Sequence, residues 1–149
     1  MIIKTLKESA KEVGINAFIT DSQSGIDTQL NRLTREEDLP IMLVSWDIRA
    51  QITFNQHGYI DNPPMDITAL LVTKPEEIRS EAAEEEAENM AQLFIKFLQN
   101  LADKQRVLIK TNQPPITNAS YQLVPWQGTS KHSGVLGSFT IKGAFDNKC

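Results

Sequence analysis

The segment Ser80–Lys104, SEAAEEEAENMAQLFIKFLQNLADK, predicts one long amphipathic helix, around which the other predicted elements are arranged. Its first nine residues carry five glutamates, and its second half is rich in Met, Phe, Ile and Leu. On a helical wheel one face collects the apolar residues Ala83, Ala87, Met90, Ala91, Phe94, Leu98 and Leu101. The opposite face collects the polar residues Glu81, Glu85, Glu88, Gln92, Lys96 and Gln99. We expect Thr73 or Ser80 to cap this helix and Pro75 to lie in its first turn.

A second, shorter helix is predicted near the N-terminus. Leu6, Ala10 and Val13 recur at helical spacing over residues 3–13, and Gly14 suits a left-handed cap at the end. Residues 15–38 mix turn formers with charges. Within them, Ile26, Leu30 and Leu33 share a spacing that favours one or two helical turns after Ser24. We therefore place one helix before the first predicted strand, and a weaker helical segment after it.

From Leu39 onward the apolar residues alternate, as in half-buried strands. The run IMLVSW (41–46) is followed by alternation at Ile48, Ala50, Ile52 and Phe54, and a second alternating series starts at Met65. The intervening QHGYIDNPP (56–64) breaks the pattern, which predicts a long β-hairpin. Its tip exposes Tyr59 and Ile60, either as an ordinary turn or as a surface that a partner covers.

Three more strand patterns follow the long helix, in RVLIKT, SYQLVPW and VLGSFTIKGAF. Proline in or beside a strand indicates an edge strand or a bulge, and Pro114, Pro115 and Pro125 lie in or beside these patterns. Strands grouped around a single long helix, without strict βαβ alternation, predict an α+β fold with a mainly antiparallel sheet. The sequence thus predicts an extended hairpin and a sheet that packs against the long central helix and the short N-terminal helix.

Composition and charge restrict the class of protein. The 149 residues, 40% of them hydrophobic, suit one domain over residues 1–149. The net charge of −4 argues against tight binding of nucleic acid through phosphates. The single cysteine, Cys149, leaves no internal disulfide, and the first residues, MIIKTLKESAKEV, resemble neither a signal peptide nor a membrane span. We expect a soluble cytoplasmic protein without membrane contact.

Catalytic motifs are absent from the sequence. His57 and His132 each lie in a polar, glycine-containing segment without metal-ligand spacing. No GxSxG, GxGxxG or Walker motif is present, and the glutamate pairs lack the apolar surroundings that raise a carboxyl pKa. We expect a non-enzymatic protein with no catalytic residue, metal or cofactor.

The glutamates of the long helix have two interpretations. Acidic residues in the first turns of a helix interact favourably with its dipole and keep the outer face solvated, which requires no function. Alternatively, Glu81, Glu84, Glu85 and Glu88 form an acidic face that repels a passing polyanion. The sequence leaves both interpretations open.

The order of predicted elements resembles the tail-terminator and tail-completion proteins of tailed bacteriophages. The segments that carry the resemblance are LPIMLVSWDI, ITALLVTKPEEIRSEAAEEEAENMAQLFIKFL and HSGVLGSFTIK. The resemblance implies a structural virion protein that is assembled in the bacterial host cytoplasm. It would form a homo-oligomeric ring, a hexamer or dodecamer, between the portal or connector and the tail, next to other neck, portal or tail proteins. DNA would pass through the channel without specific binding.

In such a ring the acidic face would line the channel, and the hairpin loop would reach a neighbouring subunit. The interface candidates are His57, Tyr59, Ile60, Asp61 and Met65. Two alternatives remain. One is a small bacterial scaffold or ligand-binding domain of the cystatin-like type, and the other is an enzyme that brings His57, Asp61 and His132 into one pocket.

Overall fold

A computed structural model of the chain describes residues 2–21, 40–45, 48–50, 56–58, 64–75, 81–109, 114–127 and 132–142. Its elements follow one another along the chain as α1 (Ile2–Glu12), β1 (Ala17–Asp21), β2 (Ile41–Ser45), β3 (Arg49–Ala50), β4 (Pro64–Pro75), α3 (Glu81–Ile109), β5 (Ile116–Gln127) and β6 (His132–Lys142). The strands form one sheet in the order β1-β2-β4-β6-β5, and the short β3 pairs with β4.

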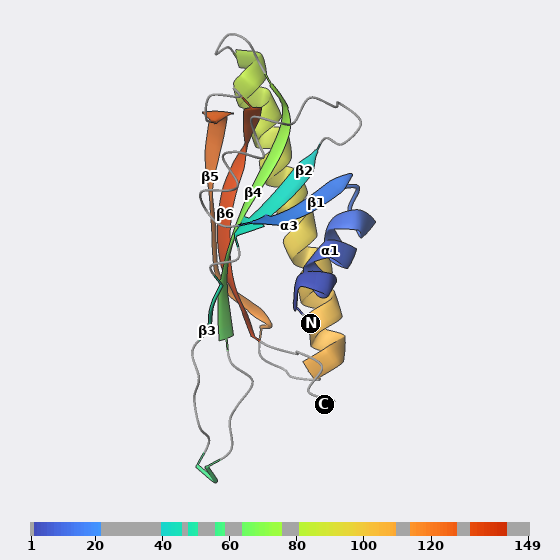
Figure 1. Cartoon of the computed structure of the whole chain (residues 1–149), viewed down its shortest axis with the longest axis vertical. Coiled ribbons are helices and arrows are strands. Elements are labelled where there is room, and N and C mark those ends of the chain that lie inside the picture. The colour runs from blue at the N-terminus through green and yellow to red at the C-terminus, as the bar shows by residue number, and fades with distance from the viewer. Residues whose placement is uncertain are drawn as a thin grey trace.

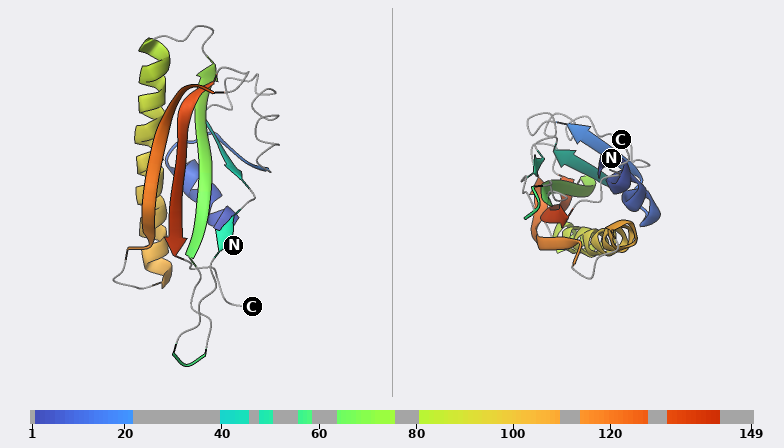
Figure 2. Two further views of the ribbon diagram at one scale, coloured as in Figure 1. Left: turned by 90° about the vertical axis from the view of Figure 1, so that its left-hand side faces the viewer. Right: turned by 90° about the horizontal axis from the view of Figure 1, so that it is seen from below.

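Both helices lie on one face of this sheet (Figures 1 and 2). The long α3 runs along β4, β6 and β5, and α1 packs beside its lower half. Pairing is antiparallel between β2 and β4, β3 and β4, β4 and β6, and β5 and β6. The predicted single α+β domain, with a mainly antiparallel sheet against one long and one short helix, is therefore confirmed.

Strand β1 is a feature that the sequence patterns did not predict. It pairs in parallel with β2, from Ala17 opposite Ile41 to Asp21 opposite Ser45. A parallel neighbour needs a crossover connection, so no tight turn in the sequence marks the pair. The helical turns predicted around Ile26, Leu30 and Leu33 lie outside the described residues.

Helix α1 ends as predicted. Gly14 adopts a left-handed φ of 92°, which glycine tolerates without strain. The Ile15 amide donates to the Ala10 carbonyl at 2.9 Å, and the Gly14 amide donates to the Lys11 carbonyl at 3.2 Å. These two bonds form a Schellman motif, which satisfies carbonyls at the helix end. Leu6 and Ala10 are buried against the main core, as their spacing predicted.

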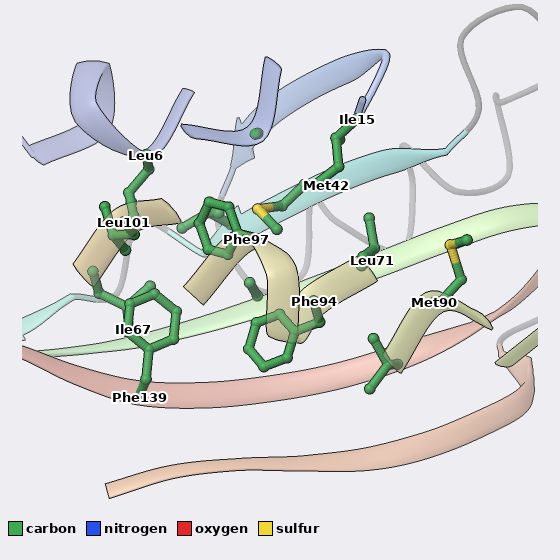
Figure 3. Packing of buried hydrophobic residues seen from close by; sticks show 14 of the residues in the cluster. Leu6, Ile15, Met42, Ile67, Leu71, Met90, Phe94, Phe97, Leu101 and Phe139 are labelled. Atoms are coloured by element: carbon green, nitrogen blue, oxygen red, sulfur yellow. The ribbon is translucent and has the colours of Figure 1, made fainter. Parts of the chain in front are cut away.

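The core is centred on the face of α3 that meets the sheet (Figure 3). Phe94, Phe97 and Phe139 form an aromatic cluster in which each pair of ring centroids is 6.2 Å apart. The predicted apolar face omitted Phe97, which is fully buried, and included Leu98, which is only partly buried. The centre of the buried face is therefore rotated slightly toward Phe97. Ala83, the first residue of the predicted apolar face, has a side chain that lies outside the described part of the structure.

The predicted C-terminal end of α3 is wrong, and so is one of the two positions predicted for its start. The segment RVLIKT was expected to form a strand, but α3 continues through Arg106 and Val107 to Ile109. Strand preference depends on packing against neighbouring strands, and Val107 is 74% exposed. Its β-branched side chain therefore does not favour a strand at this position. At the other end Pro75 and Thr73 belong to β4, not to the helix start. Ser80, the other predicted cap, lies outside the described residues.

Strand β6 confirms the predicted alternation. Val135, Gly137, Phe139 and Ile141 are buried, whereas Leu136 and Ser138 between them are exposed. Position 137 favours glycine, because an added Cβ would lie 2.2 Å from the Phe94 ring, which would then have to shift. The predicted edge strand is also confirmed, since β5 ends the sheet and its register shifts beside Pro125.

Candidate interaction surfaces

The turn at Gln56–Gly58, between β3 and β4 in the sequence, lies at one end of the molecule (Figure 1). Arg49 pairs with Asp66 and Ala50 with Met65, so the two strands run antiparallel as predicted. The turn at Gln56–Gly58 lies well beyond the end of the sheet, and all three of its residues are exposed. A turn so far from the core contributes little to stability and presents its side chains to solvent or to a partner.

The predicted interface residues fall into three groups. His57 is exposed in this turn, with its Nε2 3.4 Å from the Gln56 Nε2. Met65 lies in β4 and not in the loop, and its side chain is partly buried against the main core. Tyr59, Ile60 and Asp61 lie outside the described residues. Of the candidates whose side chains are described, His57 alone has the exposure that a contact with a partner requires.

The acidic face lies on the first turns of α3, at the opposite end of the molecule from the hairpin turn (Figure 1). Glu84, Glu85 and Glu88 are exposed, and none of them forms an ion pair within the described part of the chain. Glu81 is the first residue of α3, and its side chain is not described. Glu84 therefore lies in the first turn, where the helix dipole stabilises a negative charge, and all three carboxylates lie where a polyanion would meet repulsion.

An ion pair links the two helices toward the other end of α3. Lys104 donates to Glu12 Oε1 at 2.8 Å, which ties α3 to α1. Asn100 donates to Glu12 Oε2 at 2.9 Å. The hydrogen bonds from Lys104 and Asn100 to the carboxylate lower the pKa of Glu12 below its ordinary value of 4.5. This contact links α1 to α3 at the exposed edge of their interface, and we assign it a role in stability.

The outer face of the sheet, away from the helices, divides into two parts. A second buried apolar cluster lies on it at Ile41, Leu43, Leu70 and Val72, and polar side chains lie on it nearer the hairpin. A hollow near the hairpin contains Asp66, which accepts a hydrogen bond from the Thr140 hydroxyl at 2.6 Å. A second hollow is lined by Thr68, Gln122 and Ser138. These side chains offer hydroxyl, amide and carboxylate groups but no nucleophile paired with a base.

The two histidines of the enzyme alternative do not share a pocket, and Asp61 lies outside the described residues. His57 lies in the hairpin turn, whereas His132 pairs with Pro75 at the far end of β4. Because β4 has 12 residues, it separates them by roughly 36 Å. Among the residues that the structure describes, no three His, Cys, Asp or Glu side chains cluster to hold a metal. None of the described helices is long and apolar enough to cross a membrane.

One surface was not predicted as a site. Strand β5 is exposed from Thr117 to Leu123, and it carries Tyr121, which is 51% exposed, and Leu123, which is 36% exposed. The prolines indicated an edge strand, but the pattern alone did not show that apolar side chains remain uncovered there. The sequence did contain one indication of an uncharged surface strand, because residues 111–130 contain no Asp, Glu, Lys or Arg.

Comparison with known proteins found no match among family models, curated proteins or solved structures.

Proposed function

We propose that the chain is a structural virion protein of a tailed bacteriophage, which forms a homo-oligomeric ring in the neck as a tail terminator or head–tail joining protein. The observation that carries the proposal is the projecting hairpin turn at Gln56–Gly58. A turn placed so far from its own core has no stabilising role within the monomer. In a cyclic ring, head-to-tail contacts let each subunit extend such a hairpin onto one neighbour and receive another.

The acidic end of α3 supports a channel role for this ring. Glu84, Glu85 and Glu88 are exposed on one helix and lack cationic partners in the described part of the chain. Facing the lumen, they would keep DNA from adhering to the channel wall, since like charges repel. The same glutamates remain compatible with a solvated helix face, so they support the proposal less strongly than the hairpin does.

The test replaces residues 58–62 with a short Gly-Ser linker. The monomer should keep its melting temperature, because the described part of the turn is exposed and contacts no core residue. The variant should fail to join complete neck assemblies in phage particles viewed by negative-stain microscopy. Gln99→Ala, on the exposed face of α3, is the control and should assemble normally. Wild-type occupancy of the linker variant in particles would contradict the proposal.

A scaffold or ligand-binding domain of the cystatin-like type is the second candidate. Its support is the packing of one long helix, α3, against the antiparallel strands β4, β6 and β5, with a shallow hollow on the other face of these strands. The two candidates differ in assembly. A neck protein forms rings, either alone or on a neighbouring ring, whereas a binding domain of this type is a monomer or dimer. Light scattering and microscopy of purified protein and of particles separate them.

A further inference from the structure

The free edge of β5 is unusual for its length and composition. β5 spans 12 residues, Ile116–Gln127, at the end of the sheet. None of these residues is charged, and the uncharged run extends from 111 to 130. Natural proteins protect such edges from pairing with other chains by placing lysines, prolines or bulges along them. This edge carries no lysine at all.

The irregularities that could hinder pairing with another strand lie near the two ends of β5. The register with β6 shifts between Thr117 and Ser120, where Asn118 has a positive φ of 53°. It shifts again between Val124 and Gln127, beside Pro125. Between these irregularities, Ser120–Val124 keeps a continuous register opposite Ser138–Gly134 of β6. The edge is therefore regular over five residues, whose midpoint is Gln122.

Exposed apolar side chains gather at the same place. Tyr121 is 51% exposed and Leu123 is 36% exposed. Both lie on the helix side of the sheet, because they pair with Gly137 and Val135 of β6, which face α3. Leu136, which is 38% exposed and pairs with Gln122, lies on the opposite face. A concentration of apolar side chains at an open sheet edge marks an interaction surface.

We propose that β5 pairs antiparallel with β5 of a second copy of this chain, about a two-fold axis through Gln122. In this register Tyr121 lies opposite the second copy's Leu123, on the helix side of the sheet. An aromatic residue opposite a branched aliphatic residue is a favourable cross-strand pair, and the symmetry forms it twice. Gln122 lies opposite Gln122, and Ser120 lies opposite Val124.

The pattern of β5 is thus complementary to itself, which an isologous contact requires. The absence of charge along β5 also removes the like-charge repulsion that two identical strands would otherwise place face to face. The two sheets would become one continuous sheet, with both copies of α3 on the same side. This pairing needs only two copies and does not rest on the proposed neck function. In a neck protein it would join two rings face to face.

The first test is a disulfide across the axis. In a Cys149→Ser background, Gln122→Cys should give a cross-linked dimer under mild oxidation, because directly opposed residues lie within disulfide range. Ser138→Cys is the matched control. Ser138 is equally an exposed residue of the outer sheet face, but it lies on β6, one strand in from the edge, so two copies of it cannot meet. Selective cross-linking of the Gln122 variant supports the pairing, and equal cross-linking of both variants, or of neither, overturns it.

The second test requires no cysteine. Gln122→Lys places two like charges directly opposite each other and should weaken dimerisation by about tenfold or more in light scattering across a dilution series. Gln99→Lys, exposed on α3, should leave it unchanged. A wild-type monomer, or an oligomer that both lysine variants retain, overturns the inference. Rings that form without a Gln122 cross-link would leave the neck proposal intact and remove only this pairing.

Discussion

Replacing Gly137 by alanine should test the tightest contact in the core. An ideal Cβ at this position would lie 2.2 Å from the Phe94 Cζ, whereas ordinary contact begins at 3.4 Å. The ring must therefore move by about 1.2 Å. It has little room to do so, because Phe94 is 1% exposed and is held between the rings of Phe97 and Phe139.

Two effects of opposite sign determine the magnitude. Overpacking a core costs about 1–3 kcal/mol. Replacing glycine also reduces the conformational entropy of the unfolded chain, which stabilises the folded state by about 0.4–1 kcal/mol. The clash should dominate, so we expect Gly137→Ala to lower the free energy of unfolding by about 1–2 kcal/mol.

A double-mutant cycle in guanidinium melts checks the cause. Phe94→Leu shortens the obstructing side chain and alone should cost about 1–2 kcal/mol. Combined with Gly137→Ala, it should cost less than the sum of the two single changes by about 1 kcal/mol, because the smaller side chain leaves room for the new methyl group. Additive costs would show that Phe94 is not the obstacle.

Gly134→Ala is the matched control for this cycle. Its Cβ would lie 2.2 Å from the Leu71 carbonyl oxygen, which belongs to the backbone. No side-chain replacement can relieve that clash. Phe94→Leu should therefore combine additively with Gly134→Ala, within about 0.5 kcal/mol. Rescue of both alanine variants by Phe94→Leu would refute this assignment of the two clashes.

Two further predictions concern α3 and its contact with α1. Phe97→Ala should lower the free energy of unfolding by about 3–5 kcal/mol in a denaturant melt, because Phe97 is fully buried. Gln99→Ala should change it by no more than about 0.5 kcal/mol. Similar costs for the two variants would mean that the helix faces are misassigned. Because its folded-state pKa is lowered, Glu12 contributes stability that is present above its ordinary pKa of 4.5 and is lost as the pH falls through the folded-state value. Glu12→Gln should flatten that part of the stability–pH profile, and an unchanged profile would show that the contact with Lys104 does not contribute.

The candidate surfaces differ in how far the sequence predicts them. The hairpin follows from the break in alternation at residues 56–64, and the acidic face follows from the glutamate run and helical spacing. The exposure of Tyr121 and Leu123 could not be derived in this way. Both sit at alternating strand positions that would be buried in a central strand, and only the sheet order places β5 at an edge.

Elements whose signals are local follow from the sequence. Gly14 ends α1 because a left-handed cap requires only nearby backbone atoms, and the alternation of β6 reveals its buried side because side chains point to opposite faces in turn. The tertiary structure alone decided the features that depend on distant partners. The parallel pairing of β1 with β2 needs a crossover that no turn in the sequence marks. By its pattern the apolar run RVLI fits a strand or a helix, and only the structure shows that it continues α3 with Val107 exposed. Likewise, position 137 favours glycine only because Phe94, 43 positions earlier in the chain, fills the space above it.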